Sequence, residues 1–130
     1  MATKTEQIFE LTTPYDNKFQ GPSKRYLFVC SAGILRSPTA AAVAIKEGYN
    51  ARSCGSHHGF ALIPISVNLV YWAHKIFFMN KENYDRALQN FFGDNETLSL
   101  IKEKAIIWSI EDDYNYMQSE LVNIVEKLLP

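Results

Sequence analysis

The stretch that decides the fold runs from residue 26 to residue 40 and reads Tyr26-Leu-Phe-Val-Cys30-Ser-Ala-Gly-Ile-Leu-Arg36-Ser-Pro38-Thr-Ala40. Its apolar start predicts a buried strand that ends at Cys30, and the small residues that follow predict a tight loop. Pro38 predicts the first turn of a helix that continues to about Lys46. A loop and a helix N-terminus in this order direct backbone N–H groups at one point, where the peptide dipoles favour an anion. The same point holds the Cys30 thiol, and a nearby Arg36 favours the thiolate form, which is the nucleophilic one.

The rest of the chain alternates between short apolar runs and helical patterns. We expect further strands and helices, in chain order, at about 50–53, 66–73, 75–79, 80–91, 105–109 and 118–129. This alternation predicts an α/β fold, a three-layer sandwich in which a four-stranded parallel sheet carries helices on both faces. Ligands of such sheets bind at the carboxyl ends of the strands, so the loop after the first strand and the segment after the fourth are expected to meet there.

Length and composition indicate one small domain. The chain has 130 residues, of which 25–130 are expected to form the domain and 1–24, which have no sustained period, an extended leader. Thirteen basic and fourteen acidic residues give a net charge of −1, which argues against a nucleic-acid or membrane-surface partner. Without a long apolar stretch or a signal-peptide pattern, a cytoplasmic protein is expected, and its two cysteines are expected to be free thiols.

The stretch around Cys30 resembles the signature of the low-molecular-weight protein tyrosine phosphatases, in which Cys-x5-Arg-Ser follows the first strand of a small α/β fold. The similarity spans about residues 24 to 129 and includes Ile110-Glu-Asp-Asp-Tyr114, which resembles the Asp-Pro-Tyr loop of the family. A compact branch of the family carries Asp-Asp-Tyr at this place. The resemblance implies hydrolysis of phosphate monoesters, with a phosphotyrosine-containing protein or a small aryl phosphate as substrate and without a cofactor or a metal ion.

The resemblance also implies roles for single residues. Cys30 would attack the phosphorus atom and form a phosphocysteine, and Asp112 would act first as general acid and then as general base. Arg36 and the loop would hold the phosphate. The residues implied for this are Ser31, Ala32, Gly33, Ile34, Leu35, Arg36 and Ser37. Tyr114 and Tyr116 would form a wall against which a phenyl ring stacks.

Three residues depart from the family pattern. Gly33 stands where many members have an asparagine that braces the loop, and Leu35 replaces a second cysteine that can protect the nucleophile in a disulfide. Asp113 replaces the proline that follows the acid, which leaves open whether Asp112 or Asp113 donates the proton. Because Asp112 aligns with the family's acid, we assign the role to Asp112.

Several other side chains have two interpretations. His57 and His58 are expected on a surface loop rather than at a metal ion, because the chain offers no second pair of ligands. Cys54 is expected to be a buried thiol rather than a redox partner of Cys30. Ser37 either bonds the cysteine sulfur or caps the helix, and Tyr116 either faces the substrate or packs under the last helix.

Other functions fit the same loop less well. Cys-Ser-Ala-Gly resembles the phosphocysteine loop of sugar phosphotransferase carrier domains, which usually have a small or hydroxyl residue in place of Arg36. Arsenate reductases share the fold and the loop but need further cysteines, for which Cys54 is the only candidate. A phosphotyrosine-binding protein without activity would be favoured if Asp112 lay away from Cys30. The oligomeric state is not indicated by the sequence.

Overall fold

The computed structural model describes residues 24–130, so the predicted leader lies outside the described residues except for Lys24. The elements in chain order are β1 (Arg25–Cys30), α2 (Arg36–Lys46), β2 (Asn50–Gly55), α3 (Val67–Trp72), β3 (Lys75–Phe78), α4 (Lys81–Asn90), α5 (Asn95–Lys104), β4 (Ala105–Ile107) and α6 (Ser119–Leu128). The four strands form one sheet in the order β2-β1-β3-β4, and every neighbouring pair is parallel. The predicted four-stranded parallel sheet is confirmed.

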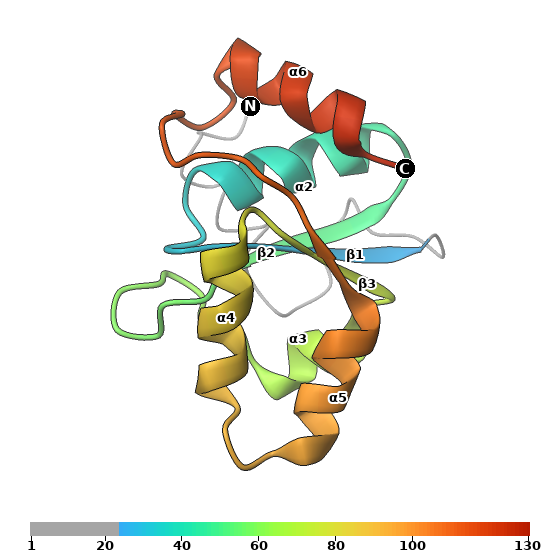
Figure 1. The fold of residues 1–130 in the computed structure, drawn as a ribbon. Coiled ribbons are helices and arrows are strands. Elements are labelled where there is room, and N and C mark those ends of the chain that lie inside the picture. The colour runs from blue at the N-terminus through green and yellow to red at the C-terminus, as the bar shows by residue number, and fades with distance from the viewer. Residues whose placement is uncertain (1–23) are drawn as a thin grey trace.

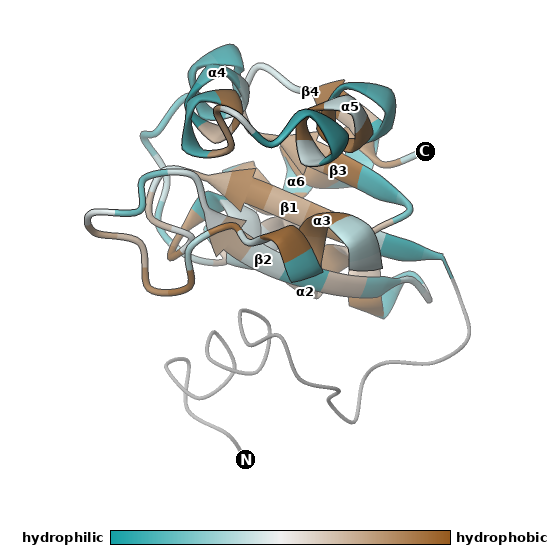
Figure 2. Ribbon diagram, turned by 90° about the horizontal axis from the view of Figure 1, so that it is seen from below, coloured by the Kyte–Doolittle hydropathy of each residue, from teal (hydrophilic) through white to brown (hydrophobic). Residues whose placement is uncertain are grey.

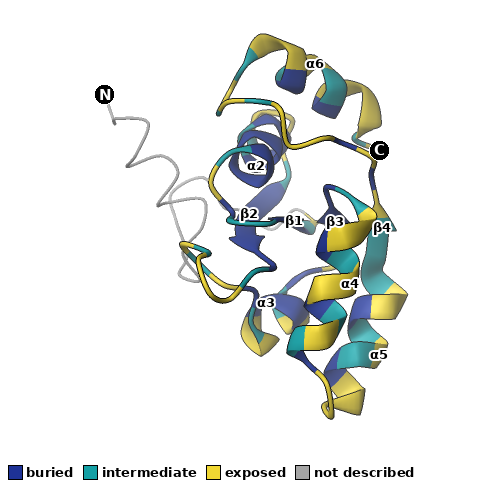
Figure 3. Cartoon of the chain, turned by 60° about the vertical axis from the view of Figure 1, so that its left-hand side comes forward, coloured by how far each residue is buried: buried dark blue, intermediate teal, exposed yellow. Residues whose placement is uncertain are grey.

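The sheet is the middle layer of a sandwich. Figure 1 shows α2 and α6 on one face of the sheet and α3, α4 and α5 on the other. Each face has its own cluster of buried apolar side chains, and β1 between them is drawn mostly in the brown of apolar residues (Figure 2). In Figure 3 the buried positions follow β1, β2, β3 and the inner side of α2, while the outer sides of α4 and α6 are exposed. The predicted three-layer architecture is therefore also confirmed.

The apolar run of β1 is continuous because the strand is covered on both faces. Successive side chains of a strand point to opposite faces, so Tyr26, Phe28 and Cys30 belong to the cluster under α2 and α6. Leu27 and Val29 belong to the cluster on the other face. A central parallel strand reads as an unbroken hydrophobic run for this reason. Cys30 thus ends the strand on the α2 side of the sheet.

Small side chains allow α2 to lie close to the sheet, and Ala40, Ala41 and Ala44 are fully buried. The helix begins at Arg36, two residues before the predicted start, so Pro38 occupies the third helical position rather than the first. Proline is tolerated there because the first N–H groups of any helix lack an intrahelical partner. The earlier start matters because it places Arg36 and Ser37 on the helix itself.

The sequence analysis missed one helix. Residues 95–104 form α5, whose start is capped by the Asp94 carboxylate, which accepts hydrogen bonds from the backbone N–H and the hydroxyl of Thr97. Only a few apolar residues of α5 face the sheet, so its periodicity was too weak to stand out.

β4 is also shorter than predicted and ends at Ile107, although the N–H of Trp108 still donates to the Phe78 carbonyl. Among residues 24–130, no helix combines the length and the apolarity that crossing a bilayer requires.

Candidate active site

A cavity of about 440 Å³ opens at the carboxyl end of β1. It is lined by Cys30, Ser31, Ala32, Ile34, Leu35, Arg36, His57, Phe60, Glu82 and Asp112. These residues come from four places: the loop after β1 with the start of α2, the loop after β2, the first turn of α4 and the segment after β4. Such a meeting at the carboxyl edge is what the sheet topology predicts.

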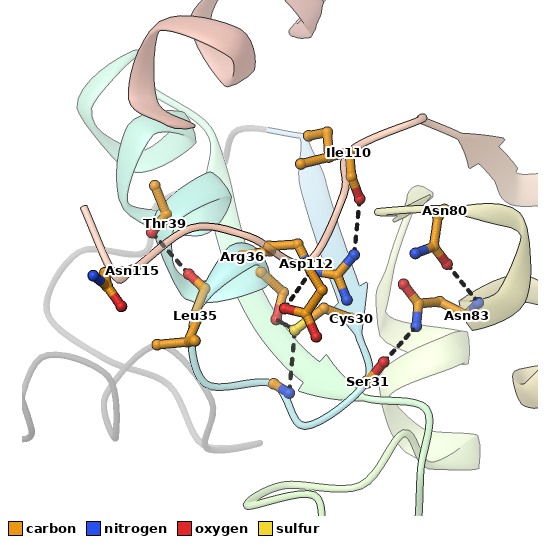
Figure 4. A network of polar contacts seen from close by, with 12 residues as sticks. Cys30, Ser31, Leu35, Arg36, Thr39, Asn80, Asn83, Ile110, Asp112 and Asn115 are labelled. Carbon is orange, nitrogen blue, oxygen red and sulfur yellow. Dashed lines mark hydrogen bonds and ion pairs between the residues drawn. The ribbon is translucent and has the colours of Figure 1, made fainter. Parts of the chain in front are cut away.

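The Cys30 sulfur lies at the bottom of this site and is nearly inaccessible, with 3% of the residue exposed. The backbone N–H of Gly33 donates to Sγ over 3.2 Å, and Oγ of Ser37 lies 3.1 Å from the same sulfur (Figure 4). The Gly33 N–H donates to the sulfur, and the Ser37 hydroxyl has two acceptors within reach, the sulfur and the Cys54 carbonyl at 3.3 Å. The two interpretations of Ser37 are thereby resolved, because the N-cap position of α2 is taken by Leu35.

The Arg36 side chain is almost fully buried, which is expensive for a cation unless it meets an anion or acceptors. One terminal nitrogen donates to the carbonyl of Ile110 over 2.8 Å. Nε lies 3.4 Å from Oδ1 of Asp112 and has no hydrogen-bond partner among the described residues. A buried N–H without a partner beside a cavity is a donor available to a bound anion.

The segment that carries Asp112 is attached to the first turn of α2 on both sides. Before Asp112, the Ile110 carbonyl receives the bond from Arg36. After it, the N–H of Met117 donates over 2.8 Å to the hydroxyl of Thr39, which itself donates to the Leu35 carbonyl. Figure 4 shows the ion pair between Asp112 and Arg36.

Asp112 and Asp113 differ in what they face. Asp112 lines the cavity and forms the ion pair with Arg36, although 62% of its side chain is exposed. Asp113 is exposed and is not among the described residues that line the cavity. This geometry favours Asp112 as the proton donor of the two.

The seven residues expected to bind phosphate fall into two groups. Five of them line the cavity: Ser31, Ala32, Ile34, Leu35 and Arg36. Gly33 and Ser37 contact the Cys30 sulfur instead.

Gly33 explains one departure from the family pattern. Its φ of +74° is a conformation that side chains disfavour. In addition, a Cβ there would lie 2.8 Å from the carbonyl carbon of Cys54 and 2.9 Å from the nitrogen of Gly55. The loop thus packs directly on the backbone at the end of β2, and a side chain at position 33 has no room.

The structure does not bring the two tyrosines of the predicted aromatic wall to this cavity. Neither Tyr114 nor Tyr116 is among the described residues that line the cavity. Tyr114 packs against the apolar cluster under α2 and α6, because the segment after Asp112 turns toward these helices. Tyr116 is partly buried, and this burial raises the pKa of its hydroxyl.

The aromatic surface of the cavity comes from the loop after β2. Phe60 lines the cavity with 62% of its surface exposed, and its ring centre lies 5.0 Å from that of His57. Nε2 of His57 lies 3.5 Å from Oε1 of Glu82 at the start of α4. The sequence analysis missed Phe60 and Glu82. The available signal was their position after the second and third predicted strands, at the same edge as Cys30.

His57 and His58 differ in how far they are exposed. Both lie on the loop after β2, where 12% of the His57 side chain is exposed and His58 is exposed as predicted. In the described part of the chain, no three His, Cys, Asp or Glu side chains gather as a metal site would require.

Cys54 lies close to Cys30 in the sheet but on the opposite face. The residue paired with Cys30 is Gly55, and Cys54 pairs with Val29, with which it shares the cluster under α3, α4 and α5. Both cysteines are free thiols. Burial, and next the charge of Cys30, raise the pKa of the Cys54 thiol well above its usual value. Cys54 is therefore a buried thiol of the core, as expected.

A solved structure agrees with this architecture. The YwlE arginine phosphatase from Geobacillus stearothermophilus superposes with a TM-score of 0.60, covering 81% of this chain and 90% of its own, at 19% sequence identity. The chain has the low-molecular-weight phosphatase fold. No family model matches the sequence, and no curated protein matches it either. An identity of 19% shows the low-molecular-weight phosphatase fold and does not show the activity.

Proposed function

We propose that this protein is a cysteine-dependent phosphatase that hydrolyses phosphate monoesters through a phosphocysteine on Cys30. The observation that carries the proposal is the buried Arg36 guanidinium, which lines the same cavity as the Cys30 sulfur and whose Nε–H makes the 3.4 Å ion pair with Asp112 but no hydrogen bond among residues 24–130. A buried donor of this kind beside a nucleophile fits a tetrahedral oxyanion. The fold supports the proposal because its YwlE neighbour is a phosphatase.

In the first step the Cys30 thiolate attacks phosphorus, so that an S–P bond forms while the bond to the leaving oxygen breaks. Arg36 and the loop amides from Ser31 to Arg36 hold the equatorial oxygens as charge redistributes. Asp112 transfers its proton to the departing oxygen. Its exposed position at the mouth of the cavity suits a group that must reach a leaving group bound outside the phosphate loop.

In the second step a water molecule attacks the phosphocysteine. Asp112, now ionised, accepts a proton from the water, the S–P bond breaks, and inorganic phosphate leaves with Cys30 again a thiolate. The Ser37 hydroxyl at 3.1 Å stabilises the sulfur as it departs.

For the substrate we favour an aryl phosphate, with phosphotyrosine on a protein as the biological form. The cavity is bordered by the apolar side chains of Ile34 and Phe60, which are 38% and 62% exposed and can cover the two faces of a ring. Phe60 thus takes the role that the sequence assigned to Tyr114 and Tyr116. Free thiols fit a reducing compartment, so we place the enzyme in the cytoplasm.

A second substrate class is favoured by one observation. Two carboxylates, Glu82 and Asp112, line the cavity from different elements. Carboxylates form bidentate pairs with guanidinium groups, so the site also fits phosphoarginine, which the structural neighbour's name gives as its substrate class.

The experiment is hydrolysis by the full chain of p-nitrophenyl phosphate and of matched peptides that carry phosphotyrosine, phosphoarginine or phosphoserine. We expect turnover of the aryl phosphate, preference for the phosphotyrosine peptide, and loss of all activity in Cys30→Ser. Activity retained in Cys30→Ser would overturn the mechanism. Transfer of the phosphoryl group to a sugar without release of phosphate would indicate a carrier, and preference for the phosphoarginine peptide would select the second class.

A further inference from the structure

Asn83 on α4 joins two loops of the active site through one buried side chain. Its Nδ2 donates to Oγ of Ser31 over 3.1 Å and to Oγ of Ser56 over 3.4 Å. Ser31 is the first residue after Cys30, and Ser56 follows β2 (Figure 4 shows the bond to Ser31). Asn83 itself is completely buried. The side chain therefore fixes both serine hydroxyls relative to α4.

The position of Asn83 is itself well defined. Oδ1 of Asn80 accepts a hydrogen bond from the backbone N–H of Asn83 over 3.0 Å and so caps α4. On the other side, the N–H of Ser56 donates to the Cys30 carbonyl and the N–H of His57 to the Ser31 carbonyl. Asn83 thus connects a capped helix to a pair of loops that are already hydrogen-bonded to each other.

The remaining atom of the amide indicates what this connection is for. Oδ1 of Asn83 is buried and has no hydrogen-bond partner among the described residues. An unpaired buried acceptor destabilises a fold, whereas an apolar side chain of the same shape would not. Stability of the fold alone therefore does not explain an asparagine at position 83. Its advantage over an apolar residue must lie in the hydrogen bonds to Ser31 and Ser56.

We propose that Asn83 is a positioning residue of the phosphate loop, which acts through the Ser31 hydroxyl; this rests on the proposed function of the loop. Gly33 has no side chain with which to brace the loop, and the close packing on β2 leaves no room for one. Asn83 supplies the brace from α4. It holds the first loop residue after the nucleophile, so that the loop amides keep their direction toward the phosphate.

The test compares Asn83→Ala, Ser31→Ala and the double variant. Binding of inorganic phosphate is measured by protection of Cys30 from alkylation by iodoacetate, and kcat and KM are measured with p-nitrophenyl phosphate. We expect Asn83→Ala to weaken phosphate protection and to raise KM by roughly 10-fold, the effect of one lost hydrogen bond at a buried site. The double variant should lose less than the product of the two single losses, because both changes remove the same contact.

Thr97→Val is the matched control, since it also removes a buried side-chain hydrogen bond, but on α5 and outside the cavity lining. It should lower the melting temperature and leave phosphate protection unchanged. The proposal is overturned if Asn83→Ala behaves like this control, or if the losses of the two single variants multiply. Because phosphate protection does not require turnover, a wild-type protein that binds phosphate without hydrolysing it would overturn the phosphatase and still test the role of Asn83.

Discussion

Nε of the buried Arg36 lies 3.4 Å from Oδ1 of Asp112, and the two residues are 76 positions apart in the chain (112 − 36). Arg36 is the first residue of α2, directly after the loop that follows the first strand, and Asp112 lies in the segment after the fourth strand. The contact brings a cation suited to phosphate and a carboxyl suited to proton transfer to the same side of the Cys30 sulfur. A phosphate bound at the Cys30 sulfur would have its equatorial oxygens toward the Arg36 guanidinium and its leaving group toward the Asp112 carboxyl.

Asp112 and Asp113 should differ in how strongly kcat falls when each is changed to asparagine. Asp112→Asn is expected to slow hydrolysis of phenyl phosphate by roughly 10²–10⁴, because this leaving group needs a proton, and to slow p-nitrophenyl phosphate much less. Asp113→Asn is the matched control and should leave both rates within about twofold. The measurement is kcat for both esters. A larger loss in Asp113→Asn would transfer the acid role to that residue.

A positive charge at position 36 should not be sufficient for the activity that Arg36 supports. Arg36→Lys keeps the positive charge but loses the planar fork that donates to Ile110 and faces Asp112. We expect kcat/KM for p-nitrophenyl phosphate to fall by roughly 10²–10³, as for the loss of a transition-state donor. Circular dichroism should show the same fold. Near-normal kcat/KM in Arg36→Lys would mean that the phosphate is bound elsewhere.

Phe60 should control the affinity for flat leaving groups. Phe60→Ala removes the exposed ring beside the cavity, so KM for aryl phosphates is expected to rise about 5- to 10-fold with little change in melting temperature. KM for a small alkyl phosphate should hardly change. Tyr116→Ala serves as control, because it also removes a ring and Tyr116 is not among the described residues at the cavity. The opposite pattern would restore the wall that the sequence analysis predicted.

Oxidation of Cys30 should be only partly reversible. Cys30 and Cys54 face opposite sides of the sheet, so a disulfide between them would require one strand end to turn over. After hydrogen peroxide and then dithiothreitol, we expect incomplete recovery, because a sulfenic acid without a partner proceeds to sulfinic acid. Cys54→Ser should recover to the same extent. Full recovery in the wild type, together with a linked Cys30–Cys54 peptide in the mass spectrum, would show that Cys54 resolves the oxidised thiol.

A comparison of Gly33 with Gly48 measures how tightly the phosphate loop packs on the end of β2. Gly33 and Gly48 both have positive φ, +74° and +96°, but a Cβ at Gly48 would meet no described atom within 4 Å. Gly48→Ala should therefore cost only the backbone conformation, about 1 kcal/mol of unfolding free energy. Gly33→Ala should cost about 1–3 kcal/mol more, because the loop must move away from β2. Urea denaturation of both variants makes the comparison, and equal losses would show that the contact with β2 is loose.

Much of the fold could be predicted because its signals are local. The unbroken apolar run of β1 and the alanines of α2 each indicate an element buried on a particular side. α5 could not be found in this way. Its start depends on the cap formed by Asp94 and Thr97, and only Thr97 and Ile101 of its residues are buried, so its hydrophobic pattern is weak.

The site could be predicted only in part, for a similar reason. The loop from Cys30 to Ser37 is contiguous, so its chemistry can be read from one stretch of residues. Phe60 and Asn83 belong to the site through strand order, which decides what lies beside the loop in space. The tyrosines after Asp112 were misplaced because the path of that segment depends on the bond between Met117 and Thr39, which no sequence pattern announces.

The attachment of the Asp112 segment to α2 on both sides has a consequence for how a substrate gets in and out. Displacing this segment would require breaking the hydrogen bonds at Ile110 and at Met117, which hold it to one helical turn. Phe60 and Glu82 line the cavity from other elements, the loop after β2 and the first turn of α4. A substrate that entered past these two residues would leave the Asp112 segment in place, so binding would not require that segment to open.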